Sequence, residues 1–307
     1  VLFRSIGVGL PLHQLGPHVS RDAVRGFCEE AEALGFTSLW VQEHLLFALN
    51  PKAPYAARPG MKIPEAYRIT MAATELLTAA AAWTEKPLIG TGILVGGYHR
   101  PVELAQRLAA IDILSNGRLI AGLSVGWSKD EHEQMDVEFH TRGRRMGELV
   151  DALLACWGPD PVSFHGEFFH IDDVLVSPKP LQQPHPPLLS GMRSGAGLQR
   201  TAAQFDIFNP ASGSIEQILE TVAAMNAMRT AEQGPIDVMQ RIFTEPPFVV
   251  PGLEPLSIDK MQQAVADAKA AGFREIIIDT AFTTEVHSPA DWVAFPRRLA
   301  AVLDAAR

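Results

Sequence analysis

Cysteine is scarce in this chain, and its scarcity excludes a fold held together by a disulfide framework. The 307 residues contain only 2 cysteines, Cys28 and Cys156. Each falls on the apolar face of a predicted helix, where a buried thiol is the ordinary interpretation. Free thiols agree with a reducing compartment, so we expect a cytoplasmic protein. The start, Val1–Ser5, has no methionine, secretory h-region or cleavage site, and we interpret it as a truncated gene product.

Long apolar runs and an excess of basic residues are missing as well. No run approaches the ~18 residues that a membrane span requires, so we expect no membrane partner. The formal net charge is −9, and without a basic stripe we expect no nucleic-acid partner. We also expect no metal, because metal-ligand spacing is missing among the histidines of the middle of the chain, namely His132, His140, His165, His170 and His185.

What the chain does contain is an alternation of strand-like and helical patterns, clearest in Leu88–Trp127. Leu88–Leu94 is apolar at nearly every position, as expected for a strand covered on both faces. Arg100-Pro101 then opens a helix, and Ser115-Asn116-Gly117 ends it before a second apolar strand. This βαβ unit predicts a parallel sheet with a right-handed crossover.

Eight such strands favour one α/β domain over residues 1–307, a (β/α)8 TIM barrel. The alternative is an open doubly wound sheet, but Gly7–Pro11 does not match the glycine fingerprint that usually follows its first strand. The strands are predicted at Ser5–Pro11, Ser38–Glu43, Leu88–Leu94, Leu119–Val125, Pro187–Gly191, Asp206–Asn209, Val238–Phe243 and Glu275–Asp279. Helices are predicted from Ser20 to Gly35 and at Met146–Trp157, Ile215–Ala231, Ile258–Ala271 and Pro289–Ala305.

Two insertions interrupt this alternation. Leu45–Glu65 leaves the C-terminal end of the second strand, where barrels carry their active sites, so we interpret it as part of a substrate lid. Before the fifth strand, Val162–Phe164 and Phe168–Ile171 alternate in polarity around Gly166-Glu167, which predicts a small hairpin. For both insertions, a surface loop without ligand contact is the alternative.

Three segments resemble a known family in their amino-acid sequence. They are LIGTGILVGGYHRPVELAQRLAAIDILSNGRLIAGLSVGW (Leu88–Trp127), RGRRMGELVDALLACW (Arg142–Trp157) and the stretch Pro161–Ser194. All three resemble the luciferase-like monooxygenases, and within them the branch that uses coenzyme F420, a deazaflavin. The resemblance implies a hydride transfer between the deazaflavin and a small organic substrate, a hairpin that shields the barrel, and a homodimer. An FMN-dependent monooxygenase with a separate reductase and a non-catalytic flavin-binding barrel are the alternatives.

Glu43 and His44 end the second predicted strand, inside a run that otherwise has the character of a buried strand. A carboxylate and an imidazole there suit proton transfer, because histidine titrates near neutral pH. A histidine that only hydrogen-bonds a loop carbonyl is the alternative. The resemblance implies that Glu43 holds the edge of the cofactor ring and that His44 is the proton donor or substrate anchor.

Two further strand ends are implied to line the cofactor. The family carries a non-prolyl cis peptide at the position of Gly92-Ile93, where its bulge presses on the ring and keeps it bent. It uses the position of Gly126-Trp127 to line the ribityl chain and the substrate side, although Trp127 equally suits a packing anchor. The run Gly96–His99 stands where many relatives have proline with an aromatic or basic residue. The resemblance therefore does not predict the shape of this pocket wall.

The turn Ser190-Gly191-Met192-Arg193 precedes a short predicted helix at Gly195–Ala203. Free N–H groups at a helix start form an anion site, and Arg193 can add a charge-assisted hydrogen bond. In the family this turn holds the cofactor phosphate, although a glycine is more usual at the position of Ser190. We therefore predict that the four residues bind the phosphate, with an ordinary turn as the alternative.

Overall fold

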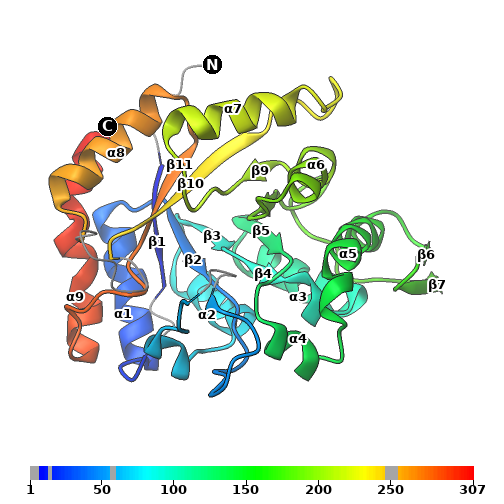
Figure 1. The fold of residues 1–307 in the computed structure, drawn as a ribbon, viewed down its shortest axis with the longest axis horizontal. Helices are drawn as coiled ribbons and strands as arrows, with labels where there is room; N and C mark the ends of the chain where they lie inside the picture. The colour runs from blue at the N-terminus through cyan, green and yellow to red at the C-terminus, as the bar shows by residue number, and fades with distance from the viewer. Residues whose placement is uncertain (1–6, 13–15, 56–59, 246–254) are drawn as a thin grey trace.

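The chain forms a closed barrel of eight parallel strands, seen in a computed structural model that describes residues 7–12, 16–55, 60–245 and 255–307 (Figure 1). Each strand pairs in parallel with the next, and β11 closes the ring by pairing with β1. The predicted (β/α)8 barrel is confirmed, and the open sheet is excluded. The eight strands are β1 (Gly7–Pro11), β2 (Ser38–Val41), β3 (Leu88–Thr91), β5 (Leu119–Ser124), β8 (Leu188–Ser190), β9 (Ile207–Phe208), β10 (Asp237–Phe243) and β11 (Glu275–Asp279).

Helices surround the barrel, with α1, α8 and α9 on one side and α3 and α5 on the other (Figure 1). Ser20 caps the first helix as predicted, because its side chain accepts a hydrogen bond from Ala23 N, and Gly35 ends it with φ +96°. The main helices are α1 (Arg21–Leu34), α2 (Ala73–Trp83), α3 (Pro101–Leu114), α5 (Arg142–Trp157), α6 (Gly195–Gln204), α7 (Ile215–Asn226), α8 (Ile258–Ala270) and α9 (Pro289–Leu299).

Two predicted helices are shorter than expected. The helix predicted to run to Ala231 ends at Asn226, whose side chain instead accepts a hydrogen bond from Ile236 N at 2.9 Å. The last predicted helix breaks after Leu299 into a 3₁₀ turn, Ala300–Val302, and α10 (Leu303–Ala306). Pro296 lies inside α9 and has no N–H for the helical ladder, which weakens the helix near this break.

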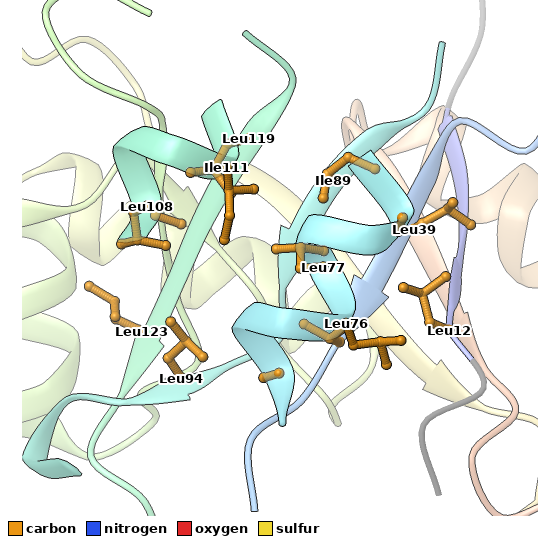
Figure 2. Packing of buried hydrophobic residues seen from close by; sticks show 14 of the residues in the cluster. Leu12, Leu39, Leu76, Leu77, Ile89, Leu94, Leu108, Ile111, Leu119 and Leu123 are labelled. Atoms are coloured by element: carbon orange, nitrogen blue, oxygen red, sulfur yellow. The ribbon is translucent and has the colours of Figure 1, made fainter. Parts of the chain in front are cut away.

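The core has two shells, one outside the barrel and one inside it. Outside, Leu76 and Leu77 of α2 pack towards Leu39 of β2 and Ile89 of β3 (Figure 2). The strand residues alternate between the two shells, as the period of a strand requires. The inner shell consists of Trp40, Ile120, Leu189, Ile207, Met239 and Ile277. A Cβ atom at Gly90 would lie 2.3 Å from the ring of Trp40, so only glycine leaves space for this indole.

The third predicted strand, Leu88–Leu94, is wrong in one respect, because it divides into β3 and a separate β4 (Leu94–Val95). Between them the backbone bonds to the end of β2 instead of continuing its ladder with β5. Gly92 N donates to Val41 O at 2.6 Å, and Ile93 O accepts from Glu43 N at 3.1 Å. The peptide bond Gly92–Ile93 is cis, as predicted.

The predicted hairpin is present as β6 (Val162–His165) and β7 (His170–Val174), paired antiparallel. Its turn is anchored to α5, because the carboxylate of Glu148 accepts hydrogen bonds from the backbone N–H groups of Glu167, Phe168 and Phe169. Figure 1 shows the hairpin beyond α5. It therefore lies against the outer face of α5.

Two observations bear on the expectations drawn from composition. Cys28 and Cys156 are buried and free, and burial raises the pKa of Cys28 to about 12, so this thiol is a packing residue. Within the described residues, no helix combines the length and the apolar character that crossing a membrane requires.

Candidate functional site

A cavity of about 210 Å³ opens at the carboxyl ends of the barrel strands, the end at which this fold carries active sites. It is lined by residues from the ends of several strands, and these residues lie far apart in the sequence. Its walls are Gln42, Glu43, His44, Tyr55, Tyr67, Gly92, Ile93, Val95, Gly126, Trp127, Glu131, Ala211, Arg241 and Phe243. The structure therefore brings together six of the residues predicted from the sequence: Glu43, His44, Gly92, Ile93, Gly126 and Trp127.

His44 lies in this cavity with one ring nitrogen engaged by a buried acid. Its Nδ1 is 3.3 Å from Oε1 of Glu131, a residue of the short helix α4 (Lys129–Gln134). The side chain of His44 is 12% exposed and that of Glu131 is 2% exposed. No hydrogen bond to Nε2 of His44 occurs within the part of the chain that the structure describes. This nitrogen remains available for a ligand.

Glu43 also lines the cavity, but its carboxylate is engaged by protein groups. Oε2 accepts a hydrogen bond from Val95 N at 2.7 Å, and both carboxylate oxygens lie 3.0 Å from Nε2 of His99. His99 belongs to the run Gly96–His99 that departs from the family pattern. The departure thus supplies the partner of Glu43, and Tyr98 of the same run donates to Glu131 at 2.9 Å.

Aromatic side chains pack against His44, and the predicted lid reaches them through Tyr55. The ring of Tyr67 packs edge-on against His44 at 4.3 Å between centroids, and Trp127 lies 5.7 Å away. Tyr55, within the predicted lid, contacts Trp127 at 5.1 Å, and its hydroxyl lies 3.3 Å from that of Tyr67. Burial raises the pKa of Tyr67 well above its ordinary value, so its phenol stays protonated.

A buried ion pair forms another wall of the cavity. The guanidinium of Arg241, in β10, donates from Nε to Asp279 Oδ2 at 2.6 Å, and Asp279 ends β11. It also donates to Gly92 O at 2.7 Å and to Gln42 Oε1 at 3.0 Å. Burial acts to lower the pKa of Arg241, but Asp279 outweighs it and the net pKa is raised. Arg241 thus ties β10 to the ends of β2, β3 and β11 at the barrel mouth.

The predicted phosphate turn divides into buried and open groups. Ser190 is buried, and its hydroxyl lies 2.6 Å from that of Thr201, while Met192 packs into the core. These two side chains therefore serve internal packing. Gly191 lies close to the first cavity, since a Cβ atom there would lie 3.4 Å from Cγ2 of Ile93, which lines that cavity. Arg193 is exposed and donates to Ser212 Oγ at 2.5 Å.

Arg193 lines a second cavity, of about 230 Å³, between the beginnings of α6 and α7. Ser212 and Pro210 line this second cavity, and Ala211 between them lines the first. The two cavities are thus separated by a single loop.

Several residues of the site were missed by the sequence reasoning as functional candidates. Glu131 carries no clear signal in the sequence, because its short helix has no apolar stripe. Arg241 offered a clearer signal, since it is a charged residue within the apolar run Val238–Phe243. Tyr98 and His99 lay in a run whose departure from the family pattern hid their roles.

The model of the luciferase-like monooxygenase family matches residues 6–297. The FMNH2-dependent dimethylsulfone monooxygenase of Pseudomonas putida is 34% identical over 156 residues, covering 50% of this chain and 43% of the relative. The F420-dependent glucose-6-phosphate dehydrogenase of Amycolatopsis mediterranei is 29% identical over 185 residues, covering 59% of this chain and 50% of the relative. The matches thus span about half the length of these curated relatives.

Solved structures show the same fold over nearly the whole chain. A monooxygenase from Streptomyces bottropensis superimposes with a TM-score of 0.75 at 19% identity, covering 96% of this chain and 98% of that one. An F420-dependent secondary alcohol dehydrogenase superimposes with a TM-score of 0.73 at 15% identity, covering 97% and 99%. With the family match across most of its length, the chain belongs to the luciferase-like monooxygenase family.

Proposed function

We propose that this protein is a coenzyme F420-dependent oxidoreductase that moves a hydride between the deazaflavin and a small organic substrate. One observation carries the proposal. His44 lines the cavity at the barrel mouth, where Glu131 engages one ring nitrogen and the other is free of protein partners among the described residues. A hydride transfer at the ring needs a proton donor or acceptor beside the substrate, and this imidazole is placed for that role.

The residues around the cavity fit a planar ring. Gly92 leaves space at the end of β3, and Ile93, Val95 and Phe243 supply apolar surface. When bound, F420 supplies the ring carbon that accepts or donates the hydride, and the protein binds and orients it. Ile93 and Gly92 would lie against the ring and Trp127 would border the substrate side.

The second cavity fits the phosphate of the same cofactor. Because it lies next to the first cavity, one cofactor could extend past the loop at Ala211 and enter both. Arg193 offers positive charge, and the free N–H groups at the beginning of α6 offer hydrogen-bond donors. Because Ser190 and Met192 are packed inside, the proposal assigns the phosphate contact to Arg193 and to the backbone of the turn at Gly191.

Water exclusion and proton transfer are assigned to the described side chains. Tyr55, Tyr67 and Trp127 cover the cavity with aromatic surface, which limits the access of water to the reacting atoms. His44 exchanges the proton at Nε2. Glu43 borders the ring, with its carboxylate held by Val95 and His99.

A second candidate function is an FMN-dependent monooxygenase, which needs oxygen and a separate reductase. The matched half of the dimethylsulfone monooxygenase favours it, since the name of that relative specifies FMNH2. A flavin would use the same two cavities, because its ring and phosphate have similar dimensions.

Titration of the purified protein with F420 and with FMN, followed by an oxygen-consumption assay of the reduced complex, separates the candidates. We expect tight F420 binding and slow oxygen consumption, because a reduced deazaflavin reacts poorly with oxygen. Preference for FMN with rapid oxygen uptake would overturn the proposal in favour of the monooxygenase. Tight binding without turnover of any substrate in a broad panel would instead identify a non-catalytic barrel.

A further inference from the structure

We propose that Glu131 is the positioning residue of His44, holding its ring with the proton on Nδ1 and with Nε2 directed to the substrate. The inference rests on the proposed function only in giving His44 a proton to transfer. It concerns a residue of α4, which lies 87 positions after His44 in the chain.

Four groups surround the carboxylate of Glu131, and each can donate a hydrogen bond to it. Oε1 lies 3.3 Å from His44 Nδ1, and it accepts from Leu45 N at 2.7 Å and Leu46 N at 3.3 Å. Oε2 accepts from the hydroxyl of Tyr98 at 2.9 Å. An ionised carboxylate accepts hydrogen bonds and donates none, so Nδ1 of His44 must carry the hydrogen.

The carboxylate of Glu131 is ionised because its partners outweigh its burial. Burial acts to raise the pKa of Glu131, while the hydrogen bonds from His44, Leu45 and Tyr98 and the charge interaction with His44 lower it, and the net pKa lies below its ordinary value. Burial and the neighbouring Glu131 charge raise the pKa of Tyr98, so its hydroxyl remains a donor. The polarity of the whole network is therefore fixed.

A neutral histidine with Nδ1–H bound to a carboxylate presents an unprotonated Nε2. In substrate oxidation, Nε2 would take the proton of a substrate hydroxyl, and bound F420 would supply the acceptor for the hydride from the carbon that carries this hydroxyl. The substrate then loses one proton and one hydride, two electrons in all, and becomes a carbonyl compound. Glu131 stabilises the imidazolium that results, as the acid of a catalytic triad does. Reduction runs through the same atoms in reverse.

The same carboxylate fixes the backbone that follows His44. Because Leu45 N and Leu46 N both bind Oε1, the peptide groups next to His44 cannot turn away without losing these hydrogen bonds. The Cα of His44 and its ring are thus oriented by one buried group. Loss of Glu131 should free both.

The test uses the purified protein labelled with ¹⁵N-histidine and needs no cofactor. Ring ¹⁵N shifts distinguish a protonated from an unprotonated nitrogen, and the His44 signals are assigned by their loss in His44→Gln. We expect Nδ1 protonated and Nε2 unprotonated at alkaline pH. The reverse tautomer in the unaltered protein would overturn the proposal outright, whether or not any variant folds.

Variants then connect the tautomer to turnover. In Glu131→Ala, both tautomers of His44 should be populated. The value of kcat should fall by about 10–100-fold, the range for partners that orient a functional histidine, with KM little changed. Glu138→Gln, an exposed acid near the same helix, should leave the His44 signals as they are. If Glu131→Ala keeps both the tautomer and kcat, Glu131 does not position His44. A correct tautomer without F420 binding would support this inference while refuting the proposed function.

Discussion

At the residue scale, the site contains two pairs of a glutamate and a histidine. Glu43 and His44 are neighbours in sequence, yet Glu43 pairs with His99 and His44 pairs with Glu131. Each of the two residues thus has a partner from another strand end. Under the proposed function, this arrangement would separate Glu43, which would border the ring, from His44, which would exchange the proton.

Arg193→Ala should weaken cofactor binding by about 1.5–3 kcal/mol, the usual contribution of a hydrogen bond to a charged group. Its guanidinium lines the second cavity and is exposed, so the substitution should not disturb the fold. Titration of cofactor into both proteins measures the difference. Arg144→Ala, which removes an exposed arginine from α5, is the matched control. Equal affinity of the Arg193 variant and the unaltered protein would place the phosphate elsewhere.

The strand-end residues could be predicted from the sequence because barrel geometry brings such positions together whatever their spacing. Glu43, His44 and Trp127 all follow this rule and line one cavity. The pairing of His44 with Glu131 could not be predicted, because it depends on where a six-residue polar helix packs. The burial of Ser190 was missed for a similar reason, since its partner Thr201 lies well inside α6, six residues after Gly195.

At the element scale, α4 holds down the beginning of the predicted lid. Glu131 binds Leu45 N and Leu46 N, and Asp130 accepts from Lys52 N at 3.0 Å. Glu133 forms an ion pair with the ammonium group of Lys52. Together these acids fasten one side of the segment over the cavity, and Tyr55 lines the cavity from it.

Protease cleavage within Leu45–Glu65 should slow when cofactor and substrate are both bound. The segment contributes Tyr55 to the cavity wall, so a ligand beneath it adds contacts that oppose local opening. Mass spectrometry of the fragments follows each cleavage site over time. Cleavage in the loop 227–236, which precedes β10 away from the cavity, is the internal control. Equal rates in Leu45–Glu65 with and without ligands would show that the segment is no lid.

Elements with a clear apolar pattern were predicted well, and polar or interrupted ones were not. The helix at Arg21–Leu34 has an apolar stripe, a serine cap and a terminal glycine, so its bounds follow from the sequence. The helix α4, KDEHEQ, has no such stripe. The division of the third strand depends on hydrogen bonds from Gly92 and Ile93 to the end of β2, which apolarity alone does not reveal.

At the scale of the whole molecule, the interior of the barrel encloses one acid that should make stability depend on pH. Glu275 of β11 is buried, with hydrogen bonds from Ser38, Thr37 at 3.1 Å and Trp40 at 3.3 Å. Burial raises the pKa of Glu275 in spite of these bonds. The folded protein therefore keeps this proton to a higher pH than the unfolded chain does.

This linkage gives a stability contribution that is complete below the unfolded pKa and is lost as pH rises towards the folded one. Glu275→Gln does not titrate, and the hydroxyl of Thr37 can accept from its amide while donating to Val8 O. The Tm of the variant should therefore improve relative to the unaltered protein from about pH 5 to about pH 8. Calorimetry at both pH values measures the difference. A constant difference, or one that moves the other way, would show that Glu275 is ionised when folded.

The central claim is that His44 exchanges the proton that accompanies hydride transfer, and its most direct test is the turnover of His44→Ala. With F420 and a substrate identified from a panel of alcohols, turnover should fall by about 10²–10⁴-fold, the range of a positioned acid or base. Cofactor affinity should change far less, because the proposed phosphate contacts come from other strands. Near-full turnover would make His44 structural. Loss of cofactor with normal turnover of the bound fraction would make it a binding residue, and either result would contradict the mechanism.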